Sequence, residues 1–198
     1  MSVPTYRATR RRFASIGLAV FASTLLLLTT STASAQDAMT KESAAVVKAA
    51  FLADLEVMRG KFIGLAQAFP ADKYTWRPMD GVRSVSEVLM LIASEGYGFA
   101  PTGLGGKAGL TREEMAPLSK VTDKAQVIDH LNKGFAHAKA SLTALDPATL
   151  TARRKIMISP NPLAVTDIAL GIGGDLHEHL GQMIAYARMN HIVPPWSK

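Results

Sequence analysis

The segment from residue 166 to residue 196 constrains the fold of this chain most strongly, because it keeps one helical period until two prolines stop it. Four polar side chains recur in it at intervals of four, three and four residues: Asp175, His179, Gln182 and Tyr186. On a helix these intervals place all four on one stripe, and the apolar residues beside them form a second stripe that faces a core. The segment is therefore predicted to be a long helix of a bundle.

Asp175 and His179 lie one helical turn apart, so that a carboxylate and an imidazole point the same way. Such a pair can share a divalent metal ion, or the carboxylate can fix the tautomer of the imidazole. The alternative is a purely structural hydrogen-bond network, which is common for polar stripes inside bundles. His177 lies about 200° around the helix from His179, and it is expected to face solvent.

Three further segments carry the apolar spacing of long amphipathic helices: residues 41–69, 84–97 and 122–145. In the first, apolar side chains recur at alternating intervals of four and three residues, as in a bundle seam. Gly60 and Gly64 interrupt this seam, and the close approach of another helix would explain them. No segment alternates as a β-strand would. The sequence thus predicts an all-α four-helix bundle with a long connection between the second and third helices.

Capping signals and helix breakers set the bounds of these helices. Ser84 and Glu87 have the spacing of a capping box at the start of the second helix. Residues 101–120 are rich in glycine but lack the G-K-[ST] of a phosphate-binding loop. They are predicted to form a flexible loop, in which Thr111 starts one short helical turn. The basic run of residues 153–155 is expected to be solvated.

Residues 1–35 have the three parts of an export signal, which are a basic start, an apolar run and small residues up to Ala35. This pattern predicts cleavage before Gln36 and a mature domain of residues 36–198. The apolar run is shorter than the roughly 20 residues that span a bilayer, so no stable membrane span is expected after cleavage. The arginines of residues 9–13 also resemble a twin-arginine signal. Either export route predicts a periplasmic or secreted protein.

The charge of the chain gives no sign of a nucleic-acid partner. Its net charge is +6, but four of its 22 basic residues lie in the export signal, which leaves 18 basic against 16 acidic residues. A net charge of +2 on the mature chain is too small to indicate a basic surface that binds nucleic acid. The chain has no cysteine, which excludes disulfides. With 48% apolar residues the mature chain is expected to form one globular domain, and a homodimer is compatible with it.

Three segments, in this order along the chain, resemble the DinB-like (YfiT-type) four-helix bundles. They are FPADKYTWRPMDGVRSVSEVLMLIA at residues 69–93, HLGQ at residues 179–182 and YARMNHIVPPW at residues 186–196. The resemblance implies a bundle with one divalent metal, commonly nickel or zinc, held by three histidines. One histidine comes from the second helix and two lie four residues apart on the last. Activities known for such proteins include thiol-dependent transfer and isomerisation and metal-dependent hydrolysis.

The resemblance carries over to this chain only in part. His179 matches one of the two histidines on the last helix, but Asp175 stands where the other is common. Leu91 stands where the second-helix histidine would fall, and leucine cannot bind a metal. Glu95 lies one turn after Leu91 on the same helical face. Glu95, Asp175 and His179 would make a site of two carboxylates and one histidine, which favours a harder metal such as manganese or iron over zinc or nickel.

Two functions follow from these changed ligands. One is a bundle without an assigned reaction, which binds a small molecule in its cleft or holds a divalent metal weakly. The other is a metal-dependent hydrolase or a thiol-dependent transferase that uses Asp175 and His179 together with Glu95. The sequence assigns neither a substrate nor catalytic residues.

Overall fold

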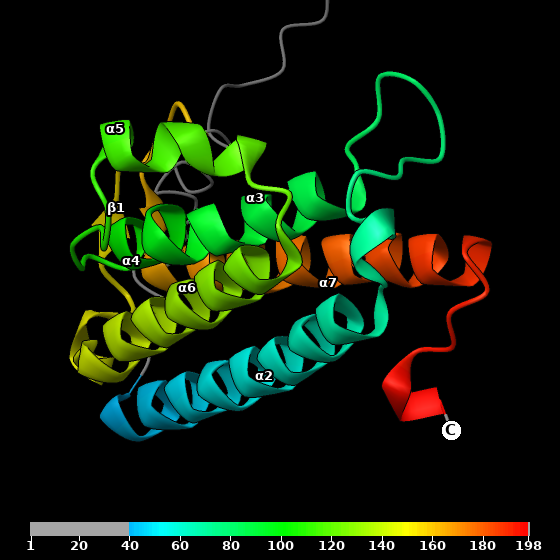
Figure 1. The fold of residues 1–198 in the computed structure, drawn as a ribbon. Coiled ribbons are helices and arrows are strands. Elements are labelled where there is room, and N and C mark those ends of the chain that lie inside the picture. The colour runs from blue at the N-terminus through cyan, green and yellow to red at the C-terminus, as the bar shows by residue number, and fades with distance from the viewer. Residues whose placement is uncertain (1–39, 198) are drawn as a thin grey trace, which may run out of the picture. The chain divides into compact units, whose positions relative to one another are not determined.

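A computed structural model describes residues 40–197, and the predicted export signal lies outside the described residues. The described chain is an all-α bundle of four long helices, as predicted (Figure 1). These helices are α2 (Lys41–Ala68), α3 (Val85–Tyr97), α6 (Lys124–Ala144) and α7 (Val165–Met189). Helix α3 packs along α6, and α2 packs against both α6 and α7. Among residues 40–197, no helix combines the length and the apolarity that crossing a bilayer requires.

The first three long helices begin at side-chain caps that the sequence encodes. The Thr40 hydroxyl accepts a hydrogen bond from the Ser43 N–H and caps α2. Ser84 and Glu87 form the predicted capping box at the start of α3. Asp123 caps α6. Helix α7 has no side-chain cap, and its first N–H groups instead donate to the backbone carbonyls of residues 150 and 152. Each helix therefore satisfies part of its free N–H groups locally.

The core of the bundle lies between the apolar stripes of the four helices. From α2 the stripe contributes Met58, Phe62 and Leu65, which are completely buried. Tyr74 follows α2 in the connection to α3, and its buried hydroxyl donates to the Ala66 carbonyl at 2.6 Å. This bond satisfies the one polar atom of a large core side chain. The connection is thus fixed to the end of the core rather than only passing over it.

Helices α3 and α6 approach each other closely at a pair of glycines. A Cβ added to Gly96 would lie 2.6 Å from the backbone of Gly134, so only glycine allows the two backbones to meet there. The close approach expected at Gly60 is absent, because nothing lies within 4 Å of a Cβ built on it. Gly64 contacts only the Pro195 ring, at 3.5 Å. The glycines of α2 therefore do not mark a helix crossing, whereas those of α3 and α6 do.

The glycine-rich segment between α3 and α6 is ordered, which corrects the expected flexible loop. It contains helix α4 (Phe99–Gly103), helix α5 (Arg112–Met115) and the 3-10 helix η2 (Ala116–Lys120). Thr111 caps α5 with a capping box, as predicted. Helix α4 contacts both α6 and α7, and Ala100 and Leu104 are buried there. The burial of these two apolar side chains thus fixes the segment against the bundle despite the backbone freedom of its glycines. The remaining short elements are the 3-10 helices η1 (Ala71–Lys73), η3 (Pro147–Thr149) and η4 (Pro195–Ser197).

A small antiparallel hairpin precedes α7, although the sequence predicted no strand. Its strands are β1 (Arg153–Arg154) and β2 (Leu163–Ala164), paired as Arg153 with Ala164 and Arg154 with Leu163. Strands of two residues are too short to show the alternation that identifies a strand in sequence. The expected solvation of the whole basic run is also wrong for Arg154, which is partly buried with its guanidinium against Gly105.

The close contact of α3 and α6 predicts opposite effects for two substitutions of the same type. Gly134→Ala should lower the free energy of unfolding by about 1–3 kcal/mol, because the new methyl group must force two backbones apart. Gly60→Ala is the matched control in open space, and it should raise that free energy by up to about 1 kcal/mol through helix propensity. Urea unfolding followed by circular dichroism measures both. A Gly134→Ala protein as stable as the parent would refute the close contact.

Candidate metal centre

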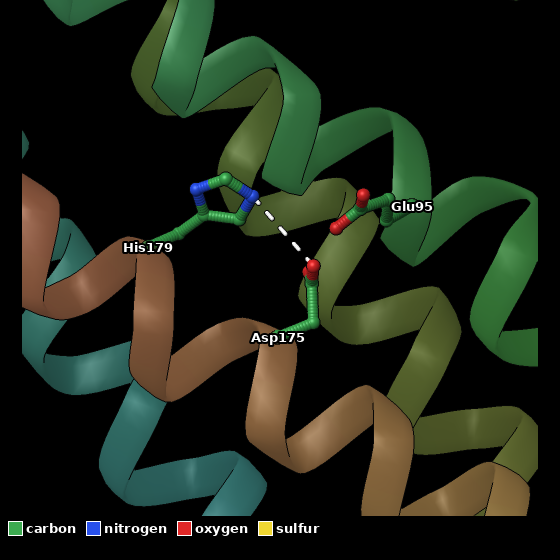
Figure 2. Close-up of side chains that lie close together, drawn as sticks. All are labelled: Glu95, Asp175 and His179. Atoms are coloured by element: carbon green, nitrogen blue, oxygen red, sulfur yellow. Dashed lines mark ion pairs between the residues drawn. The ribbon is translucent and has the colours of Figure 1, made fainter.

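Glu95 from α3 and Asp175 and His179 from α7 come together in the structure (Figure 2). Each offers one ligand atom, and these atoms all lie within 4.8 Å of one another. His179 Nε2 lies 3.6 Å from Asp175 Oδ1. The three side chains named from the sequence therefore lie together between α3 and α7.

The orientation of the His179 ring is fixed by a chain of hydrogen bonds along α7. The Tyr186 hydroxyl donates to the Arg83 carbonyl at 2.9 Å, because a carbonyl can only accept. The same hydroxyl must then accept from Gln182 Nε2, at 2.9 Å, which turns the Gln182 Oε1 atom toward His179. Oε1 accepts from His179 Nδ1 at 2.9 Å. Nδ1 therefore carries a proton, and Nε2 faces Asp175 Oδ1, where it could bind a metal ion.

The aromatic ring of Tyr186 is held as firmly as its hydroxyl. It is buried, and Trp76 packs against it edge to face with the ring centroids 5.5 Å apart. The connection between α2 and α3 thus supplies both the Trp76 ring and the carbonyl acceptor of the chain. Sequence periodicity placed Gln182 and Tyr186 on the right stripe, but no sequence signal identifies a backbone carbonyl as the end of the chain.

Glu95 and Asp175 are two carboxyl groups in contact, and this contact governs the charge of the site. Burial, and then a hydrogen bond with Asp175 and its negative charge, raises the pKa of Glu95 to about 8, while the charge of Arg83 acts in the opposite direction. Near neutral pH the Glu95 carboxyl therefore keeps a proton when no cation is present. A divalent cation would take the place of that proton, so cation binding should strengthen as the pH rises.

An apolar crevice behind the two carboxyl groups explains the burial of Glu95. It has a volume of about 20 Å³, which is room for about one water molecule. Its walls are mostly hydrocarbon and include Ile92, Phe99, Phe135 and Leu176. A carboxylate beside such a wall loses hydration on one side, which disfavours its charged form.

Leu91 lies one turn before Glu95 on α3 and contributes no donor. It lines an open pocket of about 420 Å³ together with Arg83, Ser94 and Met115. That Leu91 takes the place of a histidine ligand stays a prediction. Its surroundings combine a cation, a hydroxyl and apolar side chains, and they provide space for a small molecule one helical turn from Glu95.

Three of the other four described histidines have partners away from this centre. His177 is exposed, as predicted, and its Nε2 contacts Asp54 Oδ1 of α2 at 3.0 Å. His130 contacts a tyrosine hydroxyl at 3.4 Å, and His137 contacts a backbone carbonyl at 2.9 Å. Within residues 40–197, Glu95, Asp175 and His179 are the one group of three such side chains with ligand atoms close enough to hold a metal ion.

Comparison with known proteins supports a family but no individual relative. A family model described as the DinB superfamily matches residues 54–183, which is well over half of the chain and includes all three side chains of the centre. No curated protein and no solved structure matches the chain.

The raised pKa of Glu95 predicts how stability depends on pH. Between pH values of about 4.5 and about 8, Glu95 holds a proton in the folded chain that the unfolded chain has released. The proton therefore stabilises the fold. Its contribution to the free energy of unfolding is complete below the lower pH and is lost as the pH rises through the upper one. Glu95→Gln keeps a neutral hydrogen-bonding group at every pH. In chelator, the variant should match the parent at pH 5 and exceed it at pH 9 by a free energy of unfolding on the order of a few kcal/mol.

Urea unfolding of the parent and of Glu95→Gln at several pH values measures this difference. Titrating groups remote from Glu95 are shared by the two proteins, so they cancel in the comparison, and the difference reports on Glu95 and its neighbour Asp175. A difference that stays constant from pH 5 to pH 9 would show that the fold does not raise the pKa of Glu95.

Proposed function

The chain belongs to the DinB superfamily, and from this premise we propose that it is a metal-dependent enzyme whose ligands are Glu95, Asp175 and His179. The observation that carries the proposal is the meeting of these three donors from two helices, with ligand atoms within 4.8 Å of one another. The Nε2 atom of His179 faces this space because its Nδ1 atom donates a hydrogen bond to Gln182.

The spacing and the chemistry of the donors fit one divalent ion. Metal–ligand bonds of about 2.0–2.2 Å place neighbouring donors about 3–3.5 Å apart, and His179 Nε2 lies 3.6 Å from Asp175 Oδ1. Two carboxylates balance the charge of a divalent cation. Because two of the three donors are oxygen, the set favours manganese or iron, with zinc and nickel as the alternatives.

Three protein ligands would leave coordination positions for water and substrate. A divalent ion held by Glu95, Asp175 and His179 would supply a Lewis acid and would lower the pKa of a water bound to it. The residues of the chain have separate parts in this arrangement. Glu95 would release its proton on becoming a ligand, while Tyr186 and Gln182 orient the imidazole of His179 through its Nδ1 atom. The apolar crevice limits the access of water from behind.

Hydrolysis of a small molecule is the reaction that this arrangement supports best. The pocket beside Leu91 has room for such a molecule. Thiol transfer would need a thiol cofactor as well, since the chain has no cysteine of its own. The composition of residues 1–35 supports the further proposal that the enzyme acts outside the cytoplasm, with Gln36 as its first residue after processing.

A second candidate is a bundle of the same family that binds a small molecule without a metal. Leu91 favours it, because a ligand position common in such proteins holds a hydrocarbon side chain here. The raised pKa of Glu95 also favours it, because one shared proton already relieves the repulsion between the two carboxyl groups. In this function the centre is a hydrogen-bonded network that positions α3 against α7.

A metal titration with matched histidine variants decides between these candidates. Protein recovered after export, with Gln36 as its expected N-terminus, should bind one Mn²⁺ or Zn²⁺ per chain in calorimetry. His179→Gln should weaken this binding by more than the roughly 10- to 100-fold typical for the loss of an outer partner of a ligand. His177→Gln is the control two residues away, and it should bind as the parent does because His177 pairs with Asp54.

The metal-free candidate makes the opposite prediction. None of the three proteins would bind metal, and His179→Gln would only lower the free energy of unfolding in chelator. Equal weakening by His177→Gln would place the metal elsewhere on α7.

A further inference from the structure

The turn of the β1–β2 hairpin carries the most exposed apolar side chain among the described residues. Met157 is 97% exposed, and its neighbour Ile158 is 72% exposed. Single exposed apolar residues are common on protein surfaces and need no explanation. Two adjacent ones at the tip of a hairpin form a small apolar surface that could be covered by a partner.

The tip is ordered by its own hydrogen bonds. The Ser159 hydroxyl donates to the Asn161 carbonyl at 2.7 Å and accepts from the Asn161 N–H at 3.3 Å. The Ser159 N–H donates to the Ile156 carbonyl at 3.3 Å. The Arg153 guanidinium donates across the hairpin to the Pro162 carbonyl at 2.8 Å. The outward direction of Met157 and Ile158 is therefore set before any partner binds, which reduces the entropy lost on binding.

The base of the hairpin is anchored to the bundle. Val165 N–H, at the start of α7, donates to the Ala152 carbonyl at 2.8 Å. On the other strand, the Arg154 guanidinium packs against Gly105, whose φ of +92° and lack of a side chain make room for it. The hairpin therefore projects from a fixed base, with its apolar residues at the far end.

Basic side chains flank the apolar tip. Arg153 and Lys155 are exposed, and neither takes part in an ion pair among residues 40–197. Residues 151–164 contain no acidic side chain. Apolar side chains at the end of a projection with cations just behind them match the layers of an anionic membrane surface. There the apolar groups enter the acyl boundary and the cations remain among the headgroups.

We propose that this tip, residues 155–159, inserts into the surface of an anionic lipid bilayer. The charges favour a bilayer over a second copy of the chain, because two copies meeting tip to tip would bring Arg153 and Lys155 of both hairpins together. Two apolar side chains and two cations give a weak and reversible attachment that salt opposes. The inference is independent of the metal centre.

The absence of cysteine allows a direct test in the full chain. Met157→Cys, labelled with an environment-sensitive fluorophore, reports the surroundings of the tip alone, whatever other segments of the chain do. Met79→Cys is the matched control, a methionine that is 66% exposed and lies in the connection between α2 and α3. Vesicles of phosphatidylcholine, with and without phosphatidylglycerol, serve as the probe. Circular dichroism of each labelled protein checks the fold.

The label at position 157 should shift to the blue with the anionic vesicles only. The shift should be lost at 1 M salt, where the Debye length is about 3 Å. Lys155→Glu in the same labelled protein should abolish it as well; this variant spares Arg153, which also bonds the hairpin.

Any of four results would overturn the proposal. The first is no shift with either vesicle, and the second is an equal shift of the label at position 79. The third is an equal shift with neutral vesicles or in the Lys155→Glu protein. The fourth is a shift without vesicles that grows with protein concentration, which would assign the tip to contact between copies of the chain.

Discussion

The contact between the carboxyl groups of Glu95 and Asp175 is the constraint on which the candidate centre depends. Two ionised carboxylates at this separation repel each other, and the apolar crevice beside them removes the water that would screen the repulsion. The folded chain therefore needs a positive charge between them. A proton on Glu95 can supply this positive charge. A divalent cation, with His179 as a further ligand, can supply it as well and would also allow metal-dependent chemistry.

The bundle holds this contact from both sides, through packed helices and through the connection between α2 and α3. On one side, Gly96 and Gly134 let α3 lie directly against α6, which sets the position of Glu95 one residue away. On the other side, Tyr186 reaches from α7 to the Arg83 carbonyl, which ties the stripe of His179 to the start of α3. Centres supported by rigid elements and by a second layer of hydrogen bonds keep their geometry when a ligand binds.

Much of this arrangement could be predicted from the sequence, because helical periodicity determines which residues share a face. The intervals between Asp175, His179, Gln182 and Tyr186 gave one stripe, and the interval from Leu91 to Glu95 gave a substitute donor on the facing helix. Periodicity does not determine where two helices cross. For this reason the close contact was expected in α2, whereas it lies between α3 and α6.

Features fixed by a single tertiary contact were not predictable. The end of the hydrogen-bond chain is a backbone carbonyl, which any residue could supply. The order of the glycine-rich segment depends on a few apolar residues that dock on α6 and α7. The β1–β2 hairpin has strands of two residues, too short for any alternation, yet it presents the exposed Met157. Local sequence carries little information about such contacts, because their partners are distant in the chain.

X-ray absorption spectroscopy of the protein loaded with one Mn²⁺ or Zn²⁺ tests the central claim most directly, because it counts the imidazoles bound to the metal. The geometry of Glu95, Asp175 and His179 predicts a shell of oxygen ligands with one imidazole. A shell with two or more imidazoles would contradict the account, since it would place the metal at histidines outside this centre. A chain that takes up no metal under any condition would contradict it as well.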